Sequence, residues 1–348
     1  MTHSKLADLG WSAFFTQQLD LSELSLTPAR IAEVHRTRLH ALTETGEVDL
    51  APPLDQPETD LTVGDWVLTE GPRILRRLDR STLLTRRAAG TEVAVQPIVA
   101  NVDTIFIVSS CNDEFNVARL ERYLALVAAG GCRAVIVLTK PDLADDADSF
   151  RDAALPLARD QTVVLVNARD PDSVAQLDDW CGAGQTVALL GSSGVGKTTL
   201  TNTLTGGEDA TGAIREGDQR GRHTTTYRAL RPLPSGGWII DTPGMRTLRL
   251  SDVSEGIDAT FAEVSDLIGQ CKFRDCAHET EPGCAIQAAI AAGTLDAGRF
   301  RRWQKLKRED QRHTETVSEH RAKARSFGKM AREVMASKRK MRGMDEDD

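Results

Sequence analysis

The middle of the chain contains short runs of almost continuous apolar residues, each about the length of a strand. They are TIFIVSS (104–110), AVIVL (134–138), TVVLV (162–166), TVALL (186–190) and WIID (238–241). Such runs are typical of a mostly parallel sheet with both faces covered. Residues 115–130 between the first two runs form a helical pattern, so the sequence predicts a doubly wound α/β domain.

The N-terminal third has a different pattern. From about residue 30 to residue 91, short alternating stretches are separated by turn residues at Gly46, Pro52-Pro53, Gly64-Asp65 and Gly71-Pro72. This predicts a small β-barrel, and the OB-fold is the commonest barrel that binds RNA. Six arginines lie between residues 73 and 87, opposed there only by Asp79, which predicts a basic edge; an ordinary solvated strand face is the alternative.

Length and composition change this picture little. The 348 residues are enough for two or three domains, and 40% apolar and 27% charged residues are ordinary for a soluble globular protein. The N-terminal residues MTHSKLADLGW do not resemble a signal peptide, and no apolar stretch is long enough to span a bilayer. We therefore expect a cytoplasmic protein with no membrane partner.

The charge is distributed unevenly. Residues 299–342 contain sixteen Lys and Arg against five Asp and Glu, a local charge of +11, and the last four residues carry −4. Since the whole chain has a net charge of −8, residues 1–298 sum to −15. A basic arm on an acidic body indicates a polyanionic partner, most plausibly RNA. A solvated helix with i,i+4 ion pairs is the alternative.

Residues 191–200, GSSGVGKTTL, predict a phosphate-binding loop that follows the strand 186–190. Lys197 is expected at the β- and γ-phosphates, and Thr198 is expected to bind Mg²⁺. The predicted nucleotide contacts in this loop are Gly191, Ser192, Ser193, Gly194, Val195, Gly196, Lys197, Thr198 and Thr199.

A base-binding segment is expected upstream, at Thr139-Lys140-Pro141-Asp142. The Asp142 carboxylate only accepts hydrogen bonds, so it suits the N1–H and amino group of guanine and not the N1 acceptor of adenine. The stem of Lys140 can lie over the base, and the Thr139 hydroxyl can tie this loop to the phosphate loop. After the strand 162–166, the backbone N–H of Ala168 could reach guanine O6.

The switch residues are predicted downstream of the phosphate loop. In WIIDTPG (238–244), Asp241 would hold a magnesium-bound water and the Gly244 N–H would sense the γ-phosphate. In GRHTTT (221–226), Thr225 is the predicted magnesium ligand. His223 either positions the attacking water or contacts a partner, and the sequence does not decide between them.

These motifs together indicate a GTPase with Lys197, Thr225 and His223 as its catalytic candidates. Met245 stands where many small GTPases have the Gln that orients water, so intrinsic hydrolysis should be slow. The base-binding segment precedes the phosphate loop in the chain, which is a circular permutation of the usual order. Because domain termini usually lie close together, such a permutation preserves the fold.

A metal site is predicted immediately after the switch segment. Cys271, Cys276, His278 and Cys284 fall within fourteen residues and suit one tetrahedral, structural Zn²⁺. Disulfides are not expected in a cytoplasmic protein. The other three cysteines, Cys111, Cys132 and Cys181, lie singly in apolar segments and are expected in the core.

With these motifs in this order, the chain resembles the ribosome small-subunit-dependent GTPase A family (RsgA, also called YjeQ) over most of its length. The motifs that carry the resemblance are GDWV (64–67), TKPD (139–142), GSSGVGKTT (191–199), GRHTTT (221–226), DTPG (241–244) and CKFRDCAHETEPGCAI (271–286). The resemblance implies an OB-fold, a permuted G domain and a zinc domain. It also implies binding to the small ribosomal subunit and its rRNA, subunit-stimulated hydrolysis and a role late in subunit maturation. Thr139, Asn167 and the long basic arm depart from the family pattern.

The expected organisation has four parts: an N-terminal segment with the OB-fold (1–94), the permuted G domain (95–262), a zinc-binding domain (263–298) and a basic, helical C-terminal arm (299–348). A monomer is expected, with GTP and GDP as ligands. The competing interpretations are a GTPase acting on another RNA or on the large subunit, an ATP-dependent enzyme and a non-catalytic RNA-binding scaffold.

Overall fold

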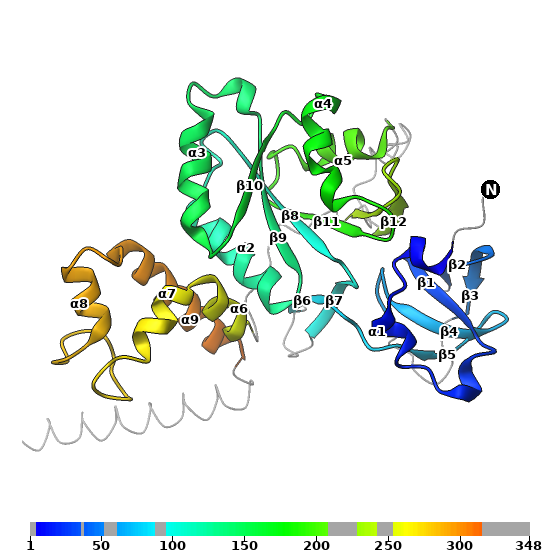
Figure 1. Cartoon of the computed structure of the whole chain (residues 1–348), viewed down its shortest axis with the longest axis horizontal. Helices are drawn as coiled ribbons and strands as arrows, with labels where there is room; N and C mark the ends of the chain where they lie inside the picture. Colours follow the sequence, from blue (N-terminus) through cyan, green and yellow to red (C-terminus); the bar gives the residue numbers. More distant parts are fainter. Residues whose placement is uncertain are drawn as a thin grey trace, which may run out of the picture.

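The computed structural model describes residues 5–35, 38–51, 61–87, 95–207, 228–241 and 253–314. Figure 1 shows three parts that follow one another in the chain: a β-barrel, a central α/β domain and a helical C-terminal part. Within the described ranges, no helix has both the length and the apolar character needed to cross a membrane.

The barrel is built from strands that pair mostly with their neighbours in the sequence. Its strands are β1 (Thr27–Val34), β2 (Leu39–Thr43), β3 (Gly46–Leu50), β4 (Trp66–Glu70) and β5 (Arg73–Arg77). The antiparallel order β3-β2-β1-β4-β5 is closed by an isolated bridge between Ala51 and Arg73. A five-stranded closed sheet of this order is the OB-fold that the alternating pattern predicted.

The N-terminal segment joins the barrel to the central domain. It contains η1 (Leu6–Leu9), α1 (Ala13–Thr16) and η2 (Leu21–Glu23). Arg30 of β1 is buried and donates to the carbonyls of Leu9, at 2.6 Å, and Asn101, at 2.9 Å, while burial lowers its pKa to about 10. The indole N–H of Trp238 in the central domain donates to the Asp8 carbonyl. The hairpin of β6 (Leu83–Arg87) and β7 (Val95–Ala100) also lies between the two domains.

The central sheet has the five strands that the apolar runs predicted and one more, β12, which they did not predict. They are β8 (Thr104–Ser110), β9 (Arg133–Thr139), β10 (Thr162–Val166), β11 (Thr186–Leu190), β12 (Ala229–Pro232) and β13 (Trp238–Asp241). Their order is β10-β9-β8-β11-β13-β12, and all neighbours are parallel except the β12–β13 pair. One residue pair, Glu33 with Ala229, continues this sheet into the barrel.

Both faces of the central sheet are covered, which explains why its strands are apolar throughout. Ile105 and Ile107 pack into one cluster with α2 (Val117–Ala129), whereas Phe106 and Val108 pack into another with α5 (Lys197–Thr205). The shorter helices of the domain are η3 (Pro141–Leu143), α3 (Ala147–Ala154), η4 (Leu155–Leu157), α4 (Pro171–Val174) and η5 (Ala175–Trp180).

The C-terminal part packs against α2. Its helices are α6 (Ser254–Thr260), α7 (Ala262–Ile268), α8 (Ala285–Ala291) and α9 (Ala297–Thr314). A Cβ atom at Gly256 of α6 would lie 2.0 Å from the Ala125 carbonyl oxygen of α2, so only glycine allows this approach. Arg299 and Arg302 of α9 both contact the fully buried carboxylate of Glu121 in α2, at 2.9 and 2.7 Å. The first sixteen residues of the predicted arm, 299–314, are therefore part of the packed fold.

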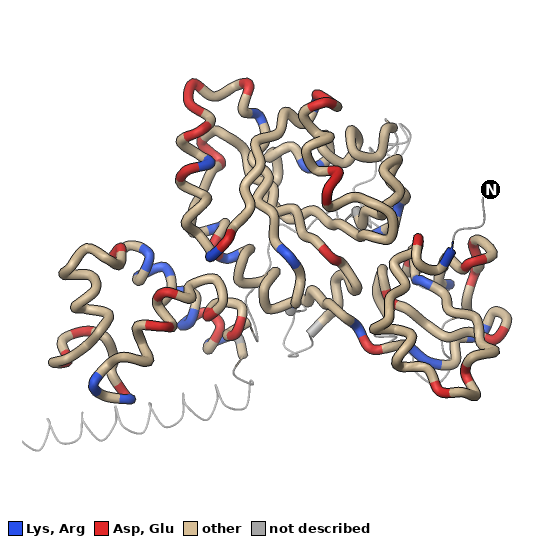
Figure 2. The backbone as a smooth tube through the Cα atoms, viewed as in Figure 1, with Lys and Arg blue, Asp and Glu red and all other residues tan. Residues whose placement is uncertain are grey.

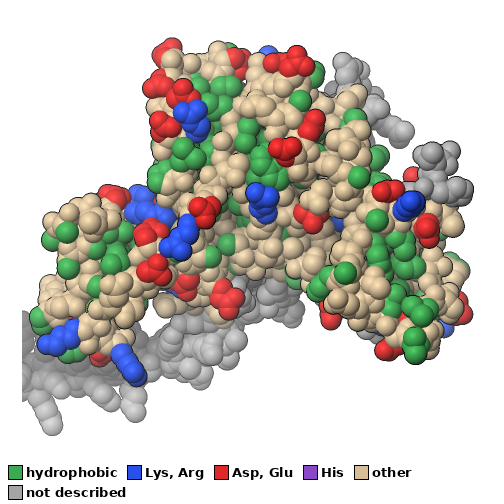
Figure 3. Space-filling model, in the orientation of Figure 1, with side chains coloured by type: hydrophobic (Ala, Val, Ile, Leu, Met, Phe, Trp, Pro, Cys, Tyr) green, Lys and Arg blue, Asp and Glu red, His purple; other side chains and the backbone are tan. Residues whose placement is uncertain are grey.

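Charged residues are distributed unevenly over the surface. Asp and Glu gather over α3 and α4, at the top of Figure 2. The loop between α7 and α8, at the lower left of Figures 2 and 3, carries both signs: Lys272 and Arg274 lie there together with Asp275, Glu279 and Glu281. The part of the arm beyond residue 314 lies outside the described residues.

Candidate functional site

The phosphate loop lies between β11 and α5, at the carboxyl edge of the sheet, where ligands bind in open α/β folds. Gly194 and Gly196 have φ values of +83° and +95°, which side chains rarely allow. A Cβ atom at Gly191 would lie 2.3 Å from the Val108 carbonyl oxygen of the neighbouring strand. The glycine spacing of the motif is therefore required by the backbone itself.

Lys197 and the start of α5 form the cationic end of this loop. The Lys197 ammonium donates to the carbonyl of Gly191, at 2.8 Å, and to that of Ser192. The helix begins at Lys197 and no side chain caps it. Its first N–H groups and the lysine thus face one place, which suits an anionic phosphate group.

The base-binding segment lies next to the phosphate loop. Thr139 ends β9 and is fully buried, and its hydroxyl lies within hydrogen-bond distance of the Val195 carbonyl, at 2.5 Å, and the Ser109 carbonyl, at 3.1 Å. The contact with Val195 is the tie between the two loops that the sequence predicted. Thr139 therefore makes this contact although Asn is commoner at its position.

Lys140 and Asp142 continue this segment. Lys140 adopts the left-handed conformation with φ +57°, and its ammonium donates to the Gly194 carbonyl at 2.8 Å. Asp142 lies in η3 and is exposed. The lysine thus bridges the base-binding segment and the phosphate loop, while the carboxylate stays accessible.

The loop after β10 joins the same edge. Ala168 is 6% exposed, and its carbonyl accepts a hydrogen bond of 2.7 Å from the hydroxyl of Thr203 in α5. The backbone N–H of Asn167 donates to the Ser173 hydroxyl at 2.9 Å. Thr203 cannot be singled out from the sequence, because nothing in its spacing from Ala168 signals the contact.

The switch residues fall largely outside the described part of the chain. Asp241 ends β13 at the carboxyl edge, but its side chain is not among those described. His223, Thr225, Gly244 and Met245 lie outside the described residues.

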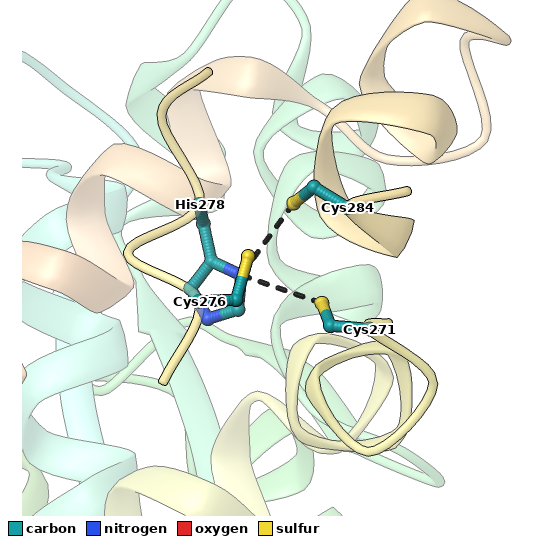
Figure 4. A group of neighbouring side chains, drawn as sticks. All are labelled: Cys271, Cys276, His278 and Cys284. Atoms are coloured by element: carbon teal, nitrogen blue, oxygen red, sulfur yellow. Dashed lines mark hydrogen bonds between the residues drawn. The ribbon is translucent and has the colours of Figure 1, made fainter. Parts of the chain in front are cut away.

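The predicted metal ligands are brought together in the C-terminal part. Figure 4 shows Cys271 after α7, Cys284 at the start of α8, and Cys276 and His278 on the intervening loop, with their donor atoms facing one another. All four ligand atoms lie within 4.8 Å of one another. The Nδ1 atom of His278 is 3.5 Å from the Cys271 sulfur and 3.6 Å from the Cys284 sulfur.

These distances fit a tetrahedral metal ion. A Zn²⁺ about 2.3 Å from each sulfur and about 2.0 Å from nitrogen places its ligand atoms roughly 3.5–3.8 Å apart. His278 is 9% exposed and has a φ of +61°, a conformation that a non-glycine residue keeps only when its surroundings require it. Four protein ligands leave no open position, so the cluster is suited to a structural role.

The thiols of this cluster differ from one another electrostatically. Desolvation would raise the pKa of Cys271, but hydrogen bonds from the N–H groups of Ala285 and Ile286 and from neighbouring thiols lower it. Desolvation and the neighbouring thiols raise the pKa of Cys276 to about 11. A divalent cation removes the penalty of gathering several thiolates in one place.

The remaining cysteines are packed, as predicted from the sequence. Cys111 and Cys181 are buried and Cys132 is half-buried. Burial raises the pKa of Cys111 and Cys132 to about 11 and that of Cys181 to about 12. Raised pKa values favour the protonated thiol near neutral pH, which suits packing in the core.

Comparison with known sequences identifies relatives along nearly the whole chain. Residues 77–251 match the RsgA GTPase family. The chain is 55% identical over 319 residues to the small ribosomal subunit biogenesis GTPase RsgA of Mesorhizobium japonicum, covering 90% of this chain and 92% of that protein. It is 49% identical over 342 residues to the small ribosomal subunit biogenesis GTPase RsgA 2 of Vibrio parahaemolyticus, covering 97% and 95% respectively.

Solved structures with the same fold also exist. YjeQ from Thermotoga maritima is 26% identical and superimposes with a TM-score of 0.61, covering 81% of this chain and 97% of that one. YloQ, described as a circularly permuted GTPase, is 22% identical with a TM-score of 0.60, covering 85% and 99%. The fold of this chain is thus shared with both structures over most of its length.

Proposed function

Because this chain belongs to the RsgA GTPase family, we propose that it binds the small ribosomal subunit and hydrolyses GTP when that subunit stimulates it. The step is proposed to act late in the maturation of the subunit. The proposal accounts for both the nucleotide site at the edge of the central sheet and the basic C-terminal arm.

The observation that carries the proposal is the contact between the base-binding and phosphate loops. The Thr139 hydroxyl lies 2.5 Å from the Val195 carbonyl, and the Lys140 ammonium lies 2.8 Å from the Gly194 carbonyl. Residues from two distant parts of the chain therefore lie in contact at one edge of the sheet, which supports a shared nucleotide site. Asp142 would select guanine, because a carboxylate can accept from its N1–H and its amino group.

The nucleotide contacts follow from this placement. The backbone N–H groups of residues 191–199 would hold the phosphates, with Lys197 at the β- and γ-phosphates and the Ala168 N–H at guanine O6. Mg²⁺ bound with GTP would be held by Thr198 and Thr225, with Asp241 on a bound water. The metal would neutralise charge on the phosphates, and Gly244 would sense the γ-phosphate.

We propose that the group which positions the attacking water takes its place only when the protein is bound to the ribosome. Met245 cannot orient a water molecule by hydrogen bonding, so the isolated protein should turn over slowly. His223 is the candidate within this chain, and a group of the subunit is the alternative. The Cys271, Cys276, His278 and Cys284 cluster is proposed to hold one structural Zn²⁺, which would fix the loop between α7 and α8.

One experiment tests the function. Phosphate release is measured from GTP and from ATP, with and without purified small ribosomal subunits; large subunits serve as the matched control. We expect slow GTP hydrolysis alone, strong stimulation by small subunits and no activity with ATP. Stimulation by large subunits instead would indicate another assembly step, and nucleotide binding without turnover would indicate a scaffold.

A further inference from the structure

The loop between α7 and α8 exposes an aromatic ring beside cations. Between the ligands Cys271 and Cys276, Phe273 is 42% exposed. The Lys272 ammonium lies 5.5 Å from the centroid of the Phe273 ring, and the next residue, Arg274, is also exposed. The ring thus contributes little to a core, and it is presented together with two positive charges.

This loop is held firmly in place. The Lys272 N–H donates to the Gly283 carbonyl at 3.1 Å, which closes the loop at its base. The Glu281 carboxylate accepts from the N–H groups of Ala277, Glu279 and Thr280, at 2.8 to 3.1 Å. A metal bound by Cys271 and Cys276 would fix both ends of the exposed segment. Binding to a ring on such a loop loses little conformational entropy.

We propose that Phe273 is a stacking platform for an unpaired base of ribosomal RNA, with Lys272 and Arg274 at the adjoining phosphates. This rests on the proposed function and adds a contact surface to it. Single-stranded RNA is bound by aromatic side chains that stack on bases, beside cations that follow the backbone. Since Lys272 lies over the Phe273 ring, a base would stack on the opposite face.

The charges around Phe273 are mixed. Lys272 and Arg274 flank the ring, whereas Asp275, Glu279 and Glu281 on the same loop outnumber these two cations. Acidic residues also gather over α3 and α4, where they would repel a phosphate backbone (Figure 2). Stacking by Phe273 must therefore supply the larger share of the local affinity.

The test uses full-length protein, purified small subunits and a non-hydrolysable GTP analogue. Phe273→Ala should weaken binding about five- to 150-fold, because loss of one base–aromatic stack costs on the order of 1–3 kcal/mol. The salt dependence should keep its slope, since no charge is lost. The matched control is Phe14→Ala, because Phe14 is 41% exposed but lies in the N-terminal segment; this variant should bind like wild type.

Two further variants separate stacking from other contacts. Phe273→Trp should retain binding, whereas Phe273→Leu should be as weak as Phe273→Ala because leucine has no flat ring. Full binding by Phe273→Leu would point to an apolar contact with a ribosomal protein and would overturn the proposal, as would wild-type affinity in Phe273→Ala. Zinc content equal to that of wild type verifies that each variant keeps its loop. Failure of the wild-type protein itself to bind small subunits would instead overturn the proposed function.

Discussion

At the scale of single residues, the site depends on a few groups whose chemistry permits little substitution. Thr139 is an instructive exception, because its position commonly holds Asn. One hydroxyl with two carbonyl oxygens nearby, those of Val195 and Ser109, is enough to connect the loops. This position requires a hydrogen-bond donor whose side chain reaches the carbonyl oxygen of the phosphate loop, and threonine meets that requirement.

Asp142→Asn should change the base that is bound. The amide can donate where the carboxylate accepts, so guanine loses a partner and xanthine, with an acceptor at C2, gains one. We expect GTP binding at least about tenfold weaker, or about 1.4 kcal/mol, and improved binding of xanthosine triphosphate. Asp145→Asn, at an exposed position three residues further on, is the control. Unchanged GTP affinity in Asp142→Asn would remove TKPD as the base-binding segment.

Lys197→Ala should abolish turnover. The substitution removes the only side-chain charge that the phosphate loop itself carries, at the position expected for the β- and γ-phosphates. By analogy with other preorganised donors, hydrolysis should fall at least about a hundredfold. Subunit-stimulated phosphate release is measured, with Lys5→Ala as a control at an exposed residue. Normal stimulated hydrolysis in Lys197→Ala would contradict this assignment.

Residues such as Asp142 and Lys197 could be predicted from sequence because their chemistry requires fixed residue types at fixed spacing. Contacts that depend on the folded arrangement could not. Lys140 reaches Gly194 across 54 positions and Thr203 reaches Ala168 across 35, and neither pair has a local signal. The loops were therefore predictable, but only part of what connects them was.

At the scale of elements, the apolar runs located five of the six central strands, while charge counting did not show how the last described helix packs. The sixteen Lys and Arg from residue 299 onward predicted a basic, helical arm. In the structure α9 packs on α2 and α6, with Phe300 and Leu306 buried. Composition could not reveal this, because the buried partner Glu121 lies 178 positions away from Arg299.

Arg299→Ala should loosen the C-terminal part. Glu121 is fully buried and Arg299 is only 11% exposed, so the substitution leaves a buried carboxylate with Arg302 alone. Breaking such a pair typically costs about 3–5 kcal/mol, and the remaining arginine should reduce this to roughly 2–3 kcal/mol. Urea unfolding measures the loss, and Arg301→Ala, at an exposed position, is the control. Adding Glu121→Gln to Arg299→Ala should restore part of the stability; no recovery would argue against an unpaired charge as the cause.

Cys276→Ser should release the metal and unfold the loop between α7 and α8. Binding at such sites is coupled to local folding, so the barrel and central sheet should stay intact. Elemental analysis should find one zinc per wild-type chain and little in Cys276→Ser, while Cys132→Ser, outside the cluster, should keep its zinc. Wild-type protein purified without chelators and lacking zinc would exclude the site.

At the scale of the whole molecule, the permutation determines what the nucleotide can influence. Strand β13 ends at Asp241, and the chain then leads to α6 and the metal cluster. The motif order that indicated this connection is visible in the sequence directly, without any knowledge of contacts. The packing of α6 and α9 on α2 could not be seen in the sequence, although this packing joins the C-terminal part to the G domain.

The connection predicts reciprocal coupling between nucleotide and ribosome. If γ-phosphate contacts at Gly244 bias the pose of the C-terminal part, small subunits should bind tightly with a non-hydrolysable GTP analogue and weakly with GDP. By linkage, subunits must then tighten binding of the analogue by the same factor. Equal affinity of the two nucleotide forms for subunits, at matched salt, would falsify the coupling.

Removing residues 315–348 separates the electrostatic contribution of the arm to subunit binding from this coupling. The deletion begins after α9, because residues 299–314 are packed into the fold, and it takes away nine Lys and Arg. Contacts between such cations and phosphates release counterions, so the truncated protein should bind subunits more weakly in both nucleotide states and with a flatter dependence on salt. The ratio of the affinities of the GTP-analogue and GDP forms should stay nearly constant if, as proposed, the nucleotide acts through Gly244 and α6. If the truncated protein binds subunits equally well in both nucleotide forms, the nucleotide-dependent change in affinity depends on the arm itself.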